Sequence, residues 1–496
     1  MSPSTIGTAP VWAGTWVAER LGVSVQTTGS TIGIELDELV GLAIRRNPRR
    51  AHLLVSTVLG KHVPTDPRIV YGAGLLLGFL VSDVLAGAGS VATSARAAGV
   101  ADSLRAALAA EDGVAPAAFL DAVESLRAAA DVTGPSTVVV GYAETATALG
   151  HCVAAALDVP SLHSTRRAVE GVTPAAGFAE EHSHATEHLL LPQDPHFLDD
   201  ADTVVLVDDE ISTGRTALNT IRALHQAHPR GRYVVASLID LRSDADRALF
   251  AELATDLGTR IDVVTLASGA IALPGDILDR AERLLAEVPA APADPAATAT
   301  PAATATPAVD ASHDAAHAPV RRAAGWGDGV RDGARHGFSP TDEEPLAAAA
   351  DRAAAEVVPA LHGDRVLVLG FEELMYAPLQ VALALTERLR PAGGGVASVR
   401  YSTTTRSPVL AVDDPGYAIR TTLTFPSHDD PSDGPGPRHA HNVAPGIEGS
   451  RRFTDIVMVI DSPADTAELS MPGGLLDRVA GGCDQVHLVV IPSHIP

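Results

Sequence analysis

The stretch that most constrains this chain runs from Thr203 to Thr216 and reads TVVLVDDEISTGRT. The apolar β-forming residues from Val204 to Val207 have no helical period, which predicts a strand buried on both faces of a parallel sheet. Asp208 and Asp209 follow at once, and a turn of small residues then leads into an apolar-periodic helix from Ala217. This succession of strand, loop and helix is the unit of a doubly wound α/β fold.

The loop between that strand and that helix has the composition of an anion-binding site. Ser212, Thr213 and Gly214 precede the helix, so hydroxyls, backbone N–H groups and the positive end of the helix dipole converge on one place. The two aspartates cannot hold phosphate themselves, but adjacent carboxylates suit the vicinal hydroxyls of a ribose or a hydrated cation. A sugar phosphate is the simplest ligand that needs both groups. The alternative is a strand end with a polar turn and no ligand.

The same residues resemble a known fingerprint. VVLVDDEISTG is similar to the phosphoribosyl-pyrophosphate (PRPP) motif of type I phosphoribosyltransferases, with its hydrophobic run, paired acids, hydroxyl pair and glycine. The resemblance implies that Asp208 and Asp209 bind the ribose hydroxyls, and that Mg2+ binds through PRPP, with direct ligation by the two aspartates left open. It also implies a cradle for the 5′-phosphate, in which Arg215 departs from the commoner small residue. The cradle would consist of Ile211, Ser212, Thr213, Gly214, Arg215 and Thr216.

Composition excludes several classes of function. The chain has 496 residues, 46% of them hydrophobic, which allows two to four domains with their own cores. Its net charge of -25 argues against a general binder of nucleic acid or of anionic membranes, and its aromatic content of 4% argues against a single-strand stacking surface. The apolar run from Ile69 to Ser82 is shorter than the roughly 20 residues that span a bilayer, so we predict a buried helix.

Cysteine usage and the N-terminus predict a cytoplasmic protein. Cys152 and Cys483 are the only cysteines, and they form neither a disulfide framework nor a metal-binding pattern. The N-terminus shows no secretory signal. The oligomeric state stays open, a homodimer included.

Lys61 is the only lysine in a chain whose other basic residues are all arginine. A lysine kept in such a background suggests a site that needs a compact ammonium group, and we predict that Lys61 neutralises pyrophosphate during catalysis. The alternative is a surface lysine without a role. The arginines upstream of it, Arg45, Arg46, Arg49 and Arg50, suit an anionic ligand or an ordinary solvated face equally well.

From Ser136 the chain alternates strand, loop and helix, as parallel sheets require. A strand from Thr137 to Val140 precedes a loop that the resemblance assigns to pyrophosphate; its ligand residues would be Tyr142, Ala143, Glu144 and Thr145. A second strand, 159–163, ends in Arg166 and Arg167, which suit a phosphate or carboxylate. Further strands at 233–240 and 263–266 and a helix at 277–288 complete a predicted five-strand core.

A polar stretch without period, Glu170 to His188, lies where family members carry a mobile loop over the site. Its segment EEHSHATEH contains His182 and His184, which we predict to act in catalysis. The histidines and acids of this segment could hold a metal or transfer protons, although they do not have the spacing of a structural zinc site. A flexible polar loop without a catalytic role is the alternative.

Residues 290–319 are rich in Ala, Pro and Thr and predict a disordered linker between a first domain at 1–289 and a second at 320–496. The second domain repeats the strand, glycine, acid and helix pattern, with Gly370 and Glu373 aligned to Gly141 and Glu144. We therefore predict an α/β domain that is a degenerate copy of the first fold. The competing explanation is that any two parallel α/β domains share this order of strand, glycine and helix.

The second domain also carries TTRSP, from Thr404 to Pro408. With RRAHLLVSTVLGKH, GYAETATALG, STRR and EEHSHATEH, this motif resembles the phosphoribosyltransferases of bacterial tellurite-resistance and stress operons, which end in a TRSP domain. The resemblance covers nearly all of the chain outside the linker. It implies no role for the second domain's candidate site residues, which are Glu372, Glu373, Tyr401, Arg406, His439 and His441.

The sequence thus predicts a Mg2+-dependent phosphoribosyltransferase that joins PRPP to a nitrogenous base or base-like acceptor and releases pyrophosphate. The expected product is a nucleotide-like metabolite in a stress or tellurite-resistance pathway, and the expected partners are small molecules, with no nucleic acid and no membrane. A non-catalytic PRPP sensor is the alternative. The histidine-rich segment and Lys61 favour the enzyme, and no basic helix-turn-helix segment supports a DNA-binding regulator.

Overall fold

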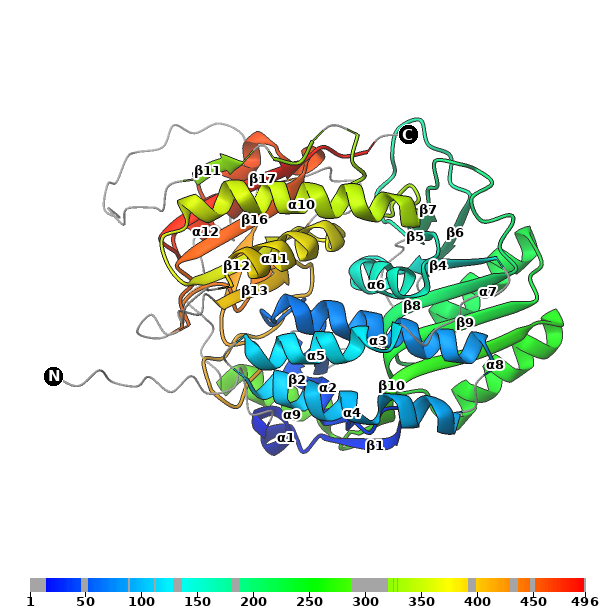
Figure 1. Ribbon diagram of the computed structural model, residues 1–496. Coiled ribbons are helices and arrows are strands. Elements are labelled where there is room, and N and C mark those ends of the chain that lie inside the picture. The colour runs from blue at the N-terminus through cyan, green and yellow to red at the C-terminus, as the bar shows by residue number, and fades with distance from the viewer. Residues whose placement is uncertain are drawn as a thin grey trace, which may run out of the picture.

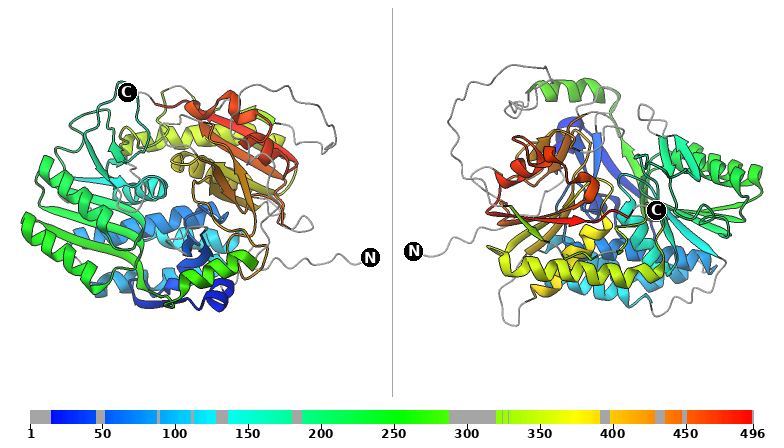
Figure 2. Two further views of the ribbon diagram at one scale, coloured as in Figure 1. Left: turned by 180° about the vertical axis from the view of Figure 1, so that it is seen from behind. Right: turned by 90° about the horizontal axis from the view of Figure 1, so that it is seen from above.

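The structure is a computed structural model, and it describes residues 15–45, 52–87, 90–110, 113–127, 136–179, 187–287, 320–323, 325–327, 329–390, 398–428, 436–446 and 451–494. Two α/β units lie side by side (Figures 1 and 2), each built on one sheet with parallel strands. The predicted linker at 290–319 lies outside the described residues, so the predicted domain boundaries remain a proposal.

The first sheet has six strands in the order β1-β10-β9-β8-β4-β5. Strands β4 (Thr137–Gly141), β5 (Ser161–His163), β8 (Thr203–Ile211), β9 (Arg232–Asp240) and β10 (Arg260–Ala272) run parallel, as predicted. The expectation of five strands was incomplete, because β1 (Ser24–Ser30) adds an antiparallel edge strand beside β10. Strand β8 also continues beyond the predicted end and carries Asp208 and Asp209 within it.

Helices cover both faces of this sheet (Figure 1). On one face lie α3 (Pro67–Leu85) and α6 (Thr147–Leu157), and on the other lie α7 (Arg215–Ala227) and α8 (Asp244–Leu257). The remaining elements of this half are α1 (Thr15–Leu21), α2 (Leu36–Leu39), α4 (Ser90–Ala109), α5 (Val114–Glu124), α9 (Ile277–Glu287) and the antiparallel pair β2 (Val40–Ile44) and β3 (His52–Ser56).

Helix α3 is the predicted buried helix. It is long and apolar enough to cross a membrane, but 83% of its most apolar window is buried inside the fold. Its glycines let α6 approach closely: a Cβ built on Gly74 would lie 2.4 Å from Cys152 Cβ, and one on Gly78 would lie 2.5 Å from Ala156 Cβ. The glycine content of α3 is therefore explained by helix packing.

The second sheet has the order β11-β17-β16-β12-β13. Its strands are β11 (Val320–Ala323), β12 (Arg365–Gly370), β13 (Ser398–Thr403), β16 (Asp455–Asp461) and β17 (Gln485–Ile491), all parallel. Its helices are α10 (Glu343–Val357), α11 (Tyr376–Arg388) and α12 (Leu475–Ala480), with short 3-10 helices η3 (Pro340–Asp342), η4 (Val358–Ala360), η7 (Ser462–Ala464) and η8 (Ala467–Ser470).

The second unit repeats the topology of the first. Strands β12, β13, β16 and β17 take the places of β4, β5, β8 and β9, and α11 takes the place of α6. Each unit also inserts an antiparallel hairpin after its second strand: β6 (Ala176–Ala179) with β7 (Glu187–Leu190), and β14 (Thr422–Phe425) with β15 (Arg438–His441). The main difference is β11, which precedes the other strands of its unit but occupies the position of β10. The second α/β domain is confirmed, and its strand order is the one that a degenerate copy of the first fold would have; the copy itself stays a prediction.

A short segment of each unit pairs with the edge strand of the other unit's sheet. Ser161, at the start of edge strand β5, forms an antiparallel bridge with Phe338 of the second unit, with both N–O distances at 2.8 Å. Tyr401, at the equivalent position of edge strand β13, forms the same bridge with Thr65 of the first unit. Each unit therefore closes the edge of the other's sheet, and α11 packs against α3 and α6 between them.

Candidate active site

The end of β8 and the start of α7 form the predicted cradle. Gly214 is the N-cap of α7 with a φ of +75°, and a Cβ there would lie 2.5 Å from the Phe250 ring, so only glycine fits this turn. The N-cap makes no side-chain hydrogen bond, which leaves the first N–H groups of a 13-residue helix without a side-chain cap. Around the turn, Ile211 is buried, Arg215 is exposed, and Ser212, Thr213 and Thr216 are half-buried.

Asp208 and Asp209 lie half-buried at the carboxyl end of β8. Desolvation raises the pKa of Asp208 well above its usual value, and the neighbouring negative charge of Asp209 raises it further. Each carboxylate also accepts a backbone N–H, from Asp209 to Asp208 at 2.9 Å and from Glu210 to Asp209 at 3.1 Å. Two crowded carboxylates would gain from a ligand that offers hydroxyl hydrogens or a cation.

The predicted pyrophosphate loop lies directly beside these carboxylates. Thr145 Oγ1 donates to Asp209 Oδ1 at 3.1 Å, which joins the loop after β4 to the end of β8. Ala143 N donates to Ser164 Oγ at 2.9 Å, and the peptide bond between Ala143 and Glu144 is cis. The Tyr142 ring is buried and packs edge-on against Phe178, with centroids 5.5 Å apart. The structure thus brings the two predicted parts of the site together.

The predicted arginine pair follows β5. Arg166 Nη1 lies 3.7 Å from Glu144 Oε2, and Arg167 Nη2 lies 3.3 Å from Glu372 Oε2 of the second unit. Both guanidinium groups are mostly buried and both face carboxylates. The arginines are therefore oriented from two sides, once by the first unit and once by the second.

The predicted lid is an antiparallel hairpin where it is described, although sequence reasoning expected an irregular loop. His182 and His184 lie outside the described residues, so their predicted catalytic role remains a prediction. His188 on β7 is 1% exposed, and its Nδ1 is 2.9 Å from Ser164 Oγ. Ser164 therefore links the hairpin to the pyrophosphate loop, a role that its hydroxyl alone did not indicate.

Lys61 is 8% exposed and lies against the second unit. Its backbone oxygen accepts a hydrogen bond from Ser402 Oγ at 3.3 Å. Burial is the main cause that lowers the pKa of His441 to about 3, and the charges of His439 and Lys61 lower it further. The role of Lys61 in neutralising pyrophosphate stays a prediction. Arg45 pairs with Val409 in an isolated bridge, and the other arginines of that run lie outside the described residues.

The candidate residues of the second unit occupy three settings. Glu372, Glu373 and Arg406 lie at the carboxyl edge of the second sheet and face the first unit, with Arg406 Nε 3.7 Å from Glu372 Oε2. Tyr401 is fully buried instead, and its hydroxyl donates to Met375 O at 3.0 Å, so it serves the core. His439 and His441 lie on β15 with their rings stacked, centroids 5.8 Å apart.

The carboxylates around the cradle fit a hydrated Mg2+. Hard carboxylate oxygens suit this ion, which keeps several waters and takes one or two protein ligands beside substrate phosphates. Asp208 and Asp209 offer such oxygens, and Glu144 Oε1 is buried without a hydrogen-bond partner in the described part of the chain. Among the described residues, no group of three or more His, Cys, Asp or Glu side chains is arranged to hold a metal. The donor set therefore suits an ion that arrives with a phosphate ligand.

Comparison with known protein families decides the identity of the two units. Residues 39–270 match the family model described as phosphoribosyl transferase, and residues 332–479 match the TRSP domain that lies C-terminal to it. The chain thus joins a phosphoribosyl transferase domain to a C-terminal TRSP domain. The first unit is its phosphoribosyltransferase domain, and the second is its TRSP domain. A search of curated proteins finds no match to the chain.

Solved structures with some likeness to the phosphoribosyltransferase domain include three enzymes. Adenine phosphoribosyltransferase from Trypanosoma brucei is 18% identical, with 27% of this chain and 58% of that chain covered and a TM-score of 0.21. The adenine enzyme from Giardia lamblia is 23% identical (30% and 80% covered, TM-score 0.22). Orotate phosphoribosyltransferase from Aeropyrum pernix is 20% identical (30% and 66% covered, TM-score 0.17). The match thus spans less than two thirds of the first of these chains, and at such TM-scores the likeness carries no argument about substrate.

Proposed function

We propose that the protein transfers the phosphoribosyl group of PRPP to a nitrogenous base or base-like acceptor and releases pyrophosphate. The observation that carries this proposal is the hydrogen bond from Thr145 Oγ1 to Asp209 Oδ1, at 3.1 Å. It joins a loop suited to pyrophosphate to a pair of acids suited to ribose, next to an uncapped helix N-terminus suited to the 5′-phosphate. One extended ligand with those three parts would contact all of them.

The reaction forms a bond between an acceptor nitrogen and C1′ and breaks the bond between C1′ and the pyrophosphate oxygen. The bonding electrons leave with pyrophosphate, and the proton on the acceptor nitrogen passes to solvent or to a basic group. Asp208 and Asp209 would hold the 2′- and 3′-hydroxyls and stabilise the positive charge that builds on the ribose. Arg166 and Arg167 would take the growing charge of the leaving group, so catalysis rests on positioning and electrostatics.

Asp208 and Asp209 are the residues that would hold Mg2+ beside the phosphates of PRPP. When bound, the ion would supply positive charge that neutralises the pyrophosphate oxygens. Glu144 would otherwise repel pyrophosphate, since its carboxylate lies in the loop that is to receive it. Its pairing with Arg166 at 3.7 Å reduces that repulsion within the protein.

The test is pyrophosphate release from PRPP with Mg2+ and a panel of purine, pyrimidine and simpler nitrogenous acceptors. We expect turnover with at least one acceptor, and its loss, together with PRPP binding, in the double variant Asp208→Asn/Asp209→Asn. The control is Asp262→Asn at the other end of the sheet, where Asp262 pairs with Arg232 and Arg260. Tight PRPP binding without turnover would support a sensor instead, and unchanged PRPP affinity in the double variant would refute the site.

We also propose a cytoplasmic location, because both cysteines are buried free thiols that suit a reducing compartment. On the sequence resemblance alone, we propose that the product serves a stress or tellurite-resistance pathway. Deleting the gene and measuring tellurite tolerance, with the Asp208→Asn/Asp209→Asn variant as the complementing control, tests this assignment. Equal tolerance in the wild type and the deletion strain would remove it.

A further inference from the structure

The exchange of edge segments places the TRSP domain directly against the arginine turn of the phosphoribosyltransferase domain. Ser161 and Tyr401 hold equivalent positions in the two sheets, and each is bridged by the other domain. Reciprocal contacts of this kind are the mark of a two-fold arrangement. The loop after β12 in the TRSP domain is thereby carried to the end of β5 in the other domain.

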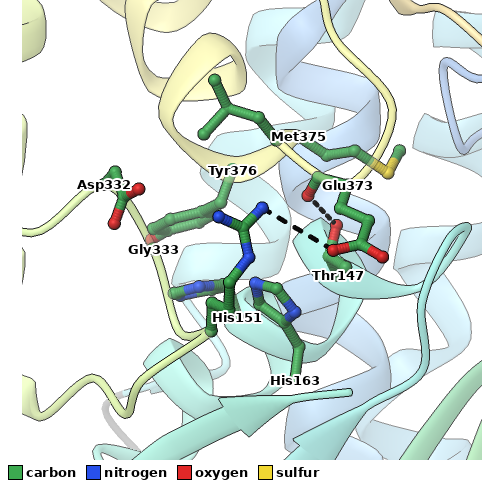
Figure 3. Close-up of a pocket in the computed structure, with 10 residues that line it drawn as sticks. Thr147, His151, His163, Asp332, Gly333, Glu373, Met375 and Tyr376 are labelled. Carbon is green, nitrogen blue, oxygen red and sulfur yellow. Dashed lines mark hydrogen bonds and ion pairs between the residues drawn. The ribbon is translucent and has the colours of Figure 1, made fainter. Parts of the chain in front are cut away.

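Glu373 in that loop contacts both ligand-binding segments of the first domain. Its Oε2 accepts from Thr165 Oγ1 at 2.7 Å, and its Oε1 accepts from Arg166 N at 2.9 Å. Its backbone oxygen accepts from Thr147 Oγ1 at 2.9 Å. Figure 3 shows Glu373 and Thr147 facing each other across the domain interface, close to His163. One residue of the TRSP domain thus fixes the start of α6 and the turn after β5 together.

The carboxylate of Glu373 is buried and surrounded by positive charge. The residue is 4% exposed, and Arg335 Nη2 lies 3.6 Å from its Oε2. Burial alone would raise its pKa, but Arg335, Arg167 and His163 lower it to about 2, helped by the backbone N–H of Arg166. The group is therefore ionised at neutral pH and accepts charge-assisted hydrogen bonds, which are the stronger kind.

The equivalent glutamate of the first domain makes different contacts. Glu144 is aligned with Glu373 through Gly141 and Gly370, yet among the described residues it makes no matching pair of hydrogen bonds across the interface. Its Oε1 has no hydrogen-bond partner within the described ranges. The neighbouring Glu372 adds a second contact, since it pairs with Arg167 at 3.3 Å. The TRSP domain therefore holds the turn after β5 through two adjacent carboxylates, whereas Glu144 acts on the TRSP domain through its charge near Arg406.

We propose that Glu373 of the TRSP domain is a positioning residue for the phosphoribosyl site, holding the Thr165–Arg167 turn so that its arginines meet pyrophosphate. The inference rests on the proposed function and gives the TRSP domain a part in it. Glu373 need not touch the substrate, because it acts through Thr165 Oγ1 and Arg166 N. Without it, the buried Thr165 hydroxyl and the partly buried Arg166 N–H lose their acceptor, and the turn gains conformational freedom that ligand binding must then remove.

The test compares Glu373→Ala and Glu373→Gln with the wild type in the full chain, by PRPP and pyrophosphate titration and by steady-state kinetics. We expect Glu373→Ala to weaken PRPP and pyrophosphate about 10- to 100-fold, as loss of a hydrogen bond to a charged group does. KM for the acceptor should stay unchanged. Glu373→Gln, which keeps one amide oxygen as acceptor, should fall between. The control is Asp455→Asn, which removes a buried carboxylate of the TRSP domain that bonds His362, Gly363 and His487.

A merely structural role would lower the active fraction, and hence kcat, equally in Glu373→Ala and Asp455→Asn, without the rise in KM for PRPP. Should Glu373→Ala fail to fold, Thr165→Val removes the other side of the bond at 2.7 Å with little change of shape and should give the same KM effect. Wild-type affinity for PRPP in Glu373→Ala and Thr165→Val would overturn the inference. Failure of the wild type itself to bind PRPP would instead overturn the proposed function.

Discussion

Replacing Asp208 by asparagine should stabilise the unliganded protein while it weakens PRPP binding. In the folded protein, desolvation and the charge of Asp209 raise the pKa of Asp208. The folded state thus holds a proton more tightly than the unfolded state, and stability is lost as pH rises above the unfolded pKa. Asparagine keeps the shape of the side chain and removes the charge, so the variant does not lose this part of its stability at neutral pH.

The magnitudes follow from general values. Repulsion between two unit charges about 4 Å apart is worth about 1–4 kcal/mol, from bulk water to a protein surface. For a domain of 150–250 residues, each 1 kcal/mol moves Tm by about 2–4 °C. A rise of a few degrees is therefore expected without ligand. With ligand, the loss of hydrogen bonds from ribose hydroxyls to a charged group should weaken PRPP by about 1.5–3 kcal/mol, which is more than tenfold.

The assay is thermal unfolding at pH 7.5 with and without PRPP and Mg2+, together with calorimetric titration of PRPP. Asp240→Asn is the matched control at the end of the next strand. Asp240 is bound by Arg242 at 2.9 Å and Arg247 at 3.0 Å. Burial opposes its ionisation, but these arginines lower its pKa. Asp240→Asn should therefore destabilise the protein, by about 3 kcal/mol or more, since it breaks a buried pair. A lower Tm for unliganded Asp208→Asn, or an unchanged PRPP-induced shift, would refute the reasoning.

Further predictions concern the interface and the core. Burial raises the pKa of Glu343 to about 7, so stability should fall by about 3 kcal/mol as pH rises from about 4.5 to about 7. Urea unfolding at pH 5 and pH 8 should show this fall in the wild type and not in Glu343→Gln. The same change in the free energy of unfolding in both proteins would contradict the prediction. Gly74→Ala should destabilise by about 1–3 kcal/mol, because its Cβ would lie 2.4 Å from Cys152 Cβ. In Gly99→Ala the added Cβ has no atom within 4 Å, so this substitution should stabilise the protein by up to about 1 kcal/mol. A change of the same sign in the free energy of unfolding for Gly74→Ala and Gly99→Ala would exclude the packing argument.

The sequence predicted most of the first sheet because its central strands are apolar runs between turn signals. Val204 to Val207 is completely buried, as its composition required. Strand β1, by contrast, reads SVQTTGS and alternates between half-buried and exposed positions. An edge strand with polar residues on both faces has no apolar signal, so only its pairing with β10 identifies it. The hairpins β6–β7 and β14–β15 were missed for a different reason, because their strands of 4 residues are too short to show a period.

The candidate site was predictable in its local parts but not in its long-range ones. Asp208 and Thr145 lie in segments whose sequence patterns predict a ligand-binding site, and the structure brings those segments together. The hydrogen bond between Thr165 and Glu373 joins residues 208 positions apart, across two domains. Nothing in the composition around Glu373 shows which partner it will meet. The alignment of Gly370 with Gly141 was the one signal that could have paired the two loops.

The exchanged edge segments also affect how the two halves of this chain can change over time. In an assembly of two identical subunits, every substitution appears twice, so neither copy can surrender a function that the other still needs. Here the two similar domains belong to one polypeptide, and each pairs with the edge strand of the other through Thr65 or Phe338. Removing either domain would expose unpaired backbone groups on the other, yet the two sequences can change independently. Such an arrangement lets one domain carry the turn proposed for ribose phosphate and the other carry carboxylates such as Glu373 that contact its neighbour.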